Sequence, residues 1–100
     1  MKPSLLTRLE HLAERLTELD RLLAEPGVTD DLDTYRKFLR EHAELTPVVA
    51  GWRTYRQAQA DCETARELAA DPEMKTYAEE ELDAAQQRVA ELELTLQRLL

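Results

Sequence analysis

The chain has 100 residues, 43% hydrophobic and 34% charged, with a formal net charge of −8 at pH 7. This length allows one domain at most, and an acidic chain is repelled by phosphate backbones, which disfavours broad binding to nucleic acids or anionic membranes. Leucine and alanine dominate the hydrophobic residues, isoleucine is absent and only two glycines occur, so we expect an all-α protein rather than a sheet.

The first predicted helix spans residues 3–25. It begins at Pro3, because proline suits a first helical position, and it ends at Glu25-Pro26-Gly27. Its leucines alternate in spacing between four and three residues: Leu5, Leu9, Leu12, Leu16, Leu19 and Leu23. This heptad pattern is typical of a coiled coil or a long helical hairpin.

The second predicted helix spans residues 30–70 and is kinked near Pro47. Thr29, Asp30 and Asp31 can each serve as its N-cap, so its start is open among them. Its apolar face is formed by Tyr35, Phe38, Leu39, His42, Leu45, Val49, Trp52, Tyr55, Ala58, Cys62, Ala65 and Ala69. Because this face continues past the proline without a gap, we favour one helix over the alternative of two stacked helices with Thr46 as a cap.

The third predicted helix spans residues 72–99. Asp71 is the expected N-cap and Pro72 the first helical residue. The apolar seam of this helix is Met74, Ala78, Leu82, Ala85, Val89, Leu92, Leu96 and Leu99. We therefore expect an elongated antiparallel helical hairpin or three-helix bundle with coiled-coil-like packing. The sequence stops within a leucine-rich seam at Leu100, which suggests a chain that is extended in a longer protein or by a partner.

Few residues offer catalytic or metal-binding chemistry. Gly-rich phosphate loops, nucleophile elbows and Cys–His pairs at useful spacing are absent. His42 lies on the apolar face and is interpreted as a structural histidine, whereas His11 is expected to face solvent. Cys62 is interpreted as a small buried residue and, as the single cysteine, forms no intrachain disulfide. We expect no catalytic residue, no metal ligand and no cofactor.

One zone of the chain is clearly basic and is the candidate contact surface for a partner. Its four arginines are Arg36, Arg40, Arg53 and Arg56. Aromatic residues interleave with them, which is compatible with stacking on RNA bases. Because Phe38, Trp52 and Tyr55 fall on the predicted core face, core aromatics flanked by solvated arginines are the favoured interpretation. The run Glu79-Glu80-Glu81 is likewise interpreted as a solvated helix face rather than an acidic contact patch.

Targeting signals are not evident. The N-terminal residues MKPSLLTRLEHLAERL lack the apolar core of a signal peptide, and no apolar run is long enough to cross a membrane. We expect a cytoplasmic protein without a membrane partner.

Three segments in order, MKPSLLTRLEHL, YRKFLREHAELTPVV and LAADPEMKTYAEEEL, resemble the N-terminal domain of the bacterial class I peptide chain release factors of the type that reads UAG and UAA. The resemblance covers essentially the full chain. It implies that residues 1–100 form a single helical N-terminal domain of a longer translation termination factor. The family's codon-reading loop and Gly-Gly-Gln loop do not occur in this sequence, so no functional residue of the family maps onto it.

For this chain, the resemblance implies a docking role rather than an enzyme. It implies that the full-length factor contacts the ribosome at the stalk base of the large subunit and communicates with a GTPase release factor. Direct sequence-specific binding of nucleic acid by this chain is not expected. The alternative is a free-standing coiled-coil adaptor that dimerises through its leucine seam. The adaptor predicts a stable dimer that Leu92→Glu splits, whereas an intramolecular hairpin predicts a monomer at micromolar concentration.

Overall fold

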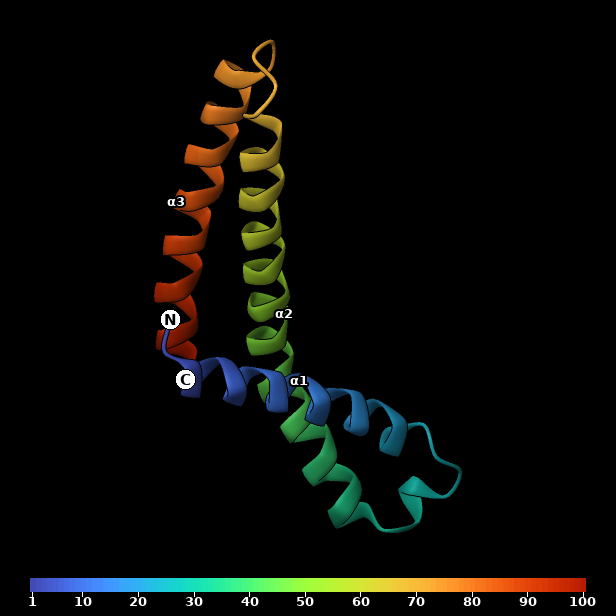
Figure 1. Ribbon diagram of the computed structural model, residues 1–100. Coiled ribbons are helices and arrows are strands. Elements are labelled where there is room, and N and C mark those ends of the chain that lie inside the picture. The colour runs from blue at the N-terminus through green and yellow to red at the C-terminus, as the bar shows by residue number, and fades with distance from the viewer. The chain divides into compact units, whose positions relative to one another are not determined.

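The computed structural model describes all residues from 1 to 100 and contains helices but no strand (Figure 1). Its elements are α1 (Pro3–Leu23), a short 3-10 helix η1 (Val28–Asp30), α2 (Leu32–Leu68) and α3 (Lys75–Leu99). The predicted all-α class is confirmed. The chain forms two compact units, Met1–Ala50 and Gly51–Leu100. Helix α2 contributes its first half to one unit and its second half to the other.

A tight loop joins α1 to α2 in the first unit. Helix α1 ends at Leu23, two residues before the predicted end. Gly27 then adopts φ 82°, a left-handed conformation that glycine accepts without steric cost. The amide of Asp30 donates a hydrogen bond to the Gly27 carbonyl at 2.9 Å. This bond closes the turn that leads the chain into α2.

Of the three candidate N-caps of α2, Thr29, Asp30 and Asp31, the structure selects Asp31. Its carboxylate accepts a hydrogen bond from the Thr34 amide at 3.2 Å and another from the Thr34 hydroxyl at 2.8 Å. These bonds lower the pKa of Asp31, because they stabilise its charged form. Helix α2 accordingly begins at Leu32 rather than at residue 30.

Helix α2 continues through Pro47 without interruption, so the alternative of two stacked helices is wrong. The Thr46 hydroxyl donates to the His42 carbonyl at 2.7 Å within the helix, instead of capping a new one. Proline removes one backbone donor, but Val48 and Val49 directly after it are buried. Burial of these side chains favours continuation of the helix over a break. The kink at Pro47 stays a prediction.

The second unit is a helical hairpin, as expected. From Gly51 onward, α2 runs antiparallel to α3, with the two helices side by side in Figure 1. Its buried residues are Trp52, Tyr55, Ala58, Cys62, Ala65, Ala78, Ala85 and Leu96. Many of these side chains are small, which lets the two helices approach closely. Gly51 belongs to the same pattern, because a Cβ atom there would lie 3.2 Å from Cδ2 of Leu96.

The turn of the hairpin differs from the prediction at Asp71-Pro72. Helix α2 ends at Leu68, and α3 begins at Lys75 rather than at Pro72. Asp71 accepts the Glu73 amide on its side chain at 3.0 Å and the Met74 amide on its carbonyl at 3.0 Å. Aspartate at the first position and proline at the second are the residues that a β-turn prefers. Asp71 therefore closes a turn instead of capping α3.

The predicted apolar seams are confirmed in their centres and wrong at two positions. Leu9, Leu16, Leu19 and Leu96 are buried as expected, but Leu39 and Leu99 are 43% and 45% exposed. Leu99 lies in the last turn of α3. In the first half of α2, Phe38 and His42 are half-buried, and Leu39 lies beside the face that they share.

Candidate docking surfaces

The four arginines singled out from the sequence are exposed residues of α2. Arg36 and Arg40 belong to the first unit, and a spacing of four places them on one helix face. Arg53 and Arg56 belong to the second unit, and a spacing of three has the same effect. The ion pairs within the chain use Arg15, Arg21, Arg66 and Arg88 instead. Arg36, Arg40 and Arg53 take part in none of these pairs, whereas the guanidinium of Arg56 lies over the Trp52 ring.

The aromatic residues beside these arginines belong to the core. Trp52 and Tyr55 are only 5% and 2% exposed, and their rings stack with centroids 5.8 Å apart. The guanidinium of Arg56 lies over the Trp52 ring at 5.7 Å, within the range of a cation–π contact. The interpretation as core aromatics is confirmed for Trp52 and Tyr55, whereas Phe38 is half-buried. These two rings offer no open face on which a nucleic-acid base could stack.

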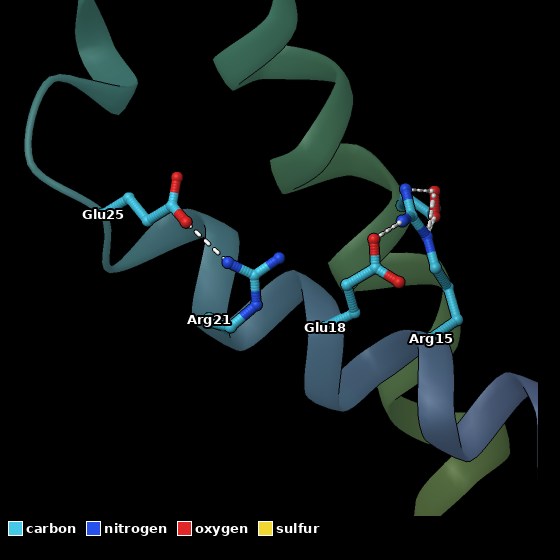
Figure 2. A network of polar contacts seen from close by, with 5 residues as sticks. Arg15, Glu18, Arg21 and Glu25 are labelled. Carbon is cyan, nitrogen blue, oxygen red and sulfur yellow. Dashed lines mark hydrogen bonds and ion pairs between the residues drawn. The ribbon is translucent and has the colours of Figure 1, made fainter.

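A polar network ties α1 to the first half of α2 (Figure 2). Arg15 donates from Nε to Glu41 Oε2 at 2.6 Å and from Nη2 to Glu41 Oε1 at 2.9 Å. Its Nη1 donates to Glu18 Oε1 at 2.9 Å, one turn along α1. Such a forked contact fixes orientation better than a single bond. Arg21 and Glu25, further along the same helix, form a separate pair at 2.6 Å.

This network predicts a defined pH response. Hydrogen bonding from Arg15 lowers the pKa of Glu41 below its ordinary value of 4.5. The stabilising contribution of Glu41 is therefore complete above that ordinary value and is lost as the pH falls through the lowered pKa. We expect Arg15→Met to return the pKa of Glu41 toward 4.5 in an NMR titration of the side-chain carboxyl groups. Arg21→Met is the matched control, because Arg21 pairs with Glu25, and an equal change of the Glu41 pKa in both variants would contradict this assignment.

In the second unit, Tyr55 links the two helices of the hairpin. Its hydroxyl donates to Glu93 Oε1 at 3.1 Å and accepts from Gln59 Nε2 at 3.0 Å. Burial raises the pKa of Tyr55, and the hydrogen bond to the Glu93 carboxylate raises it further. Together with the pair between Arg88 and Asp61 at 3.1 Å, this bond fixes the register of α2 against α3.

The histidines and the cysteine lie as the sequence suggested. His42 is half-buried with Nε2 2.7 Å from Asp20 Oδ1, and His11 is exposed. Cys62 is buried and 5% exposed. No three His, Cys, Asp or Glu side chains lie close enough together to hold a metal ion. None of the helices has an apolar stretch of the length needed to cross a membrane.

The surface of the second unit carries three shallow grooves between α2 and α3. The largest, about 420 Å³, is lined by Gln59, Cys62, Glu63, Arg66, Gln86 and Val89. A groove of about 170 Å³ near the hairpin turn is lined by Asp61, Thr64, Ala65, Leu68, Tyr77 and Glu81. A third, of about 240 Å³, is lined by Thr54, Arg88, Glu91, Leu92 and Thr95.

Sequence reasoning missed every polar contact that joins one helix to another. Pairs such as Arg15–Glu41 and Asp20–His42 join residues more than twenty positions apart. Their partners follow from the register of two packed helices, which a heptad pattern alone leaves undefined. The pairs within a helix, Arg15–Glu18 and Arg21–Glu25, have the spacing of three or four that a sequence does reveal.

The chain is similar in sequence to known proteins. No solved structure matches the chain. Peptide chain release factor 1 of Burkholderia multivorans (strain ATCC 17616 / 249) is 50% identical over 100 residues, which is all of this chain. The chain spans 28% of the length of that relative. The family model described as the PCRF domain matches residues 12–100, and the chain therefore belongs to the PCRF domain family.

Proposed function

We propose that the chain is the N-terminal domain of a bacterial class I release factor that directs peptide release at UAG and UAA codons. The observation that carries this proposal is the 50% identity to peptide chain release factor 1 along the whole chain. Because the chain spans 28% of that relative, the codon-reading and Gly-Gly-Gln domains belong to the remainder of the factor. The role of this domain is docking on the ribosome rather than catalysis.

The proposed partners are the stalk base of the large ribosomal subunit and, through it, a GTPase release factor, in the cytoplasm. Two features support a docking role. The interhelix contacts Arg15–Glu41 and Tyr55–Glu93 hold each unit in a defined shape, so exposed side chains are presented at fixed positions. The net charge of −8 favours contact with basic protein over contact with phosphate, and the exposed arginines of α2 provide local exceptions.

The adaptor alternative receives little support from the leucine seams, in which Leu39 and Leu99 are the markedly exposed members. A dimerising seam needs leucines that remain exposed in the monomer. Here Leu9, Leu16, Leu19 and Leu96 are buried within the chain itself. The similarity to a release factor along the whole chain also favours the docking role.

Charge reversal at Arg36 and Arg40 tests the docking role. In the full-length factor, Arg36→Glu with Arg40→Glu is expected to slow association with stop-codon ribosomes about three- to ten-fold at low salt, because electrostatic steering is lost. The dependence of the association rate on salt should change as well. Rapid-mixing fluorescence measures both quantities. Reversal at Arg56 is less informative, because Arg56 also contacts the Trp52 ring.

The matched control reverses Arg8 and Arg98, two exposed arginines on α1 and α3 that take part in none of the ion pairs. It changes the net charge by the same amount. Equal slowing in both double variants would show that the effect comes from the net charge and not from the positions of Arg36 and Arg40. Unchanged kinetics at every salt concentration would leave Arg36 and Arg40 as solvated bystanders.

A further inference from the structure

The groove near the hairpin turn combines an exposed aromatic ring with carboxylates. Tyr77 on α3 is 53% exposed, although large hydrophobic side chains gain by burial. Leu68, near the end of α2, lies in the same groove and supplies further apolar surface. Glu81 stands one turn after Tyr77 on the same face of α3. At about 170 Å³, the groove has room for one long side chain rather than for a helix.

The negative charge of the chain is concentrated in the residues of the hairpin turn and the helix turns next to it. Residues 61–83 contain nine carboxylates and only two basic side chains, which gives −7 out of the total of −8. The carboxylates are Asp61, Glu63, Glu67, Asp71, Glu73, Glu79, Glu80, Glu81 and Asp83. Of the two that line the groove, Asp61 already accepts from Gln57 at 3.0 Å and from Arg88 at 3.1 Å, whereas Glu81 is exposed. Such a field attracts cations and repels phosphates.

We propose that this groove is the docking site for a Lys- or Arg-rich protein segment. The aliphatic stem of one cationic side chain lies along Leu68 and the Tyr77 ring, where a cation–π contact also forms. The cationic head faces the carboxylate of Glu81, since Asp61 is already paired with Arg88. This proposal rests on the proposed function, because docking on the ribosome implies that the basic segment belongs to a ribosomal protein. RNA is the other class of partner on a ribosome, and the charge of residues 61–83 disfavours it.

Variants at Tyr77 and Glu81 test the groove in the full-length factor. Tyr77→Ala and Glu81→Gln are each expected to weaken ribosome binding about two- to five-fold, which is the size of one exposed cation–π or charged contact. Tyr77→Phe keeps the ring and should bind like the wild type. Glu79→Gln is the matched charge control, because two residues along a helix place Glu79 about 160° around the axis from Glu81. Equal weakening by Glu79→Gln and Glu81→Gln would overturn the proposal.

A photo-crosslink identifies the class of partner directly. Tyr77 is replaced by p-benzoylphenylalanine in the full-length factor, which is bound to ribosomes and irradiated, and the adduct is identified by mass spectrometry. The expected adduct is a Lys- or Arg-rich segment of a ribosomal protein. This adduct should be absent when p-benzoylphenylalanine replaces Glu79 instead of Tyr77. An adduct with ribosomal RNA, or no adduct from a factor that still binds, would overturn the groove proposal and leave the docking role intact. A factor that does not bind ribosomes at all would overturn both.

Discussion

Replacing Trp52 with alanine is expected to lower the free energy of unfolding by about 3–5 kcal/mol, the cost of removing a buried tryptophan from a core. Trp52 is 5% exposed and stacks on Tyr55, which itself hydrogen-bonds across the hairpin to Glu93. The variant therefore loses buried area and also loosens the contact that fixes the register of α2 against α3. Urea unfolding followed by far-UV circular dichroism measures the change, since this probe does not depend on tryptophan fluorescence.

Two control variants separate the packing of Trp52 from its contact with Arg56. Arg56→Ala removes the guanidinium that lies 5.7 Å from the Trp52 ring and should cost about 1 kcal/mol or less, the size of an exposed cation–π contact. Trp52→Phe keeps an aromatic ring and should fall between the two. A loss for Trp52→Ala no larger than that for Arg56→Ala would show that the indole is not part of the core.

Leu96→Ala is expected to cost about 2–5 kcal/mol, because a fully buried leucine leaves a cavity that the surrounding side chains fill only in part. Leu96 is 0% exposed on α3 and lies against the backbone of α2 at Gly51. The measurement is the same urea titration.

Leu94→Ala is the matched control for Leu96→Ala. It makes the same chemical change two residues away on the same helix, at a side chain that is 55% exposed. Its expected cost is within about 0.5 kcal/mol, as for most surface substitutions. Similar losses at both positions would contradict the orientation of α3 in the hairpin.

The sequence predicted the helices well because their signal is periodic. Buried leucines and alanines recur at helical spacing in each helix, and the buried residues of the second unit lie on the predicted faces. Apart from the exposed Leu39, the errors fall at the ends of the helices. The Asp71-Pro72 pair satisfies the rules for a helix start and equally the rules for a β-turn. The hydrogen bonds that Asp71 accepts from the amides of Glu73 and Met74 show that the pair forms a turn.

The candidate surfaces were harder to predict, for a physical reason. Docking requires exposed side chains, and the residue types at exposed positions do not recur at the regular spacing that marks a buried face. Arg36 and Arg40 stood out only because the rest of the chain is acidic. The groove at Tyr77 forms where α2 and α3 meet, so it depends on their register. Tyr77 gave no signal of its own, and Glu79-Glu80-Glu81 had suggested only a solvated face.

Ribosome binding and peptide release by the 100-residue chain, measured together, test the docking role most directly. The chain is added to ribosomes with a UAA codon in the decoding site and labelled peptidyl-tRNA, alone and in competition with the full-length factor. The expected result is saturable binding at one site that slows the full-length factor, with no peptide released by the chain itself. Release of peptide by the chain, or a failure to compete at any concentration, would contradict a domain that docks and does not catalyse.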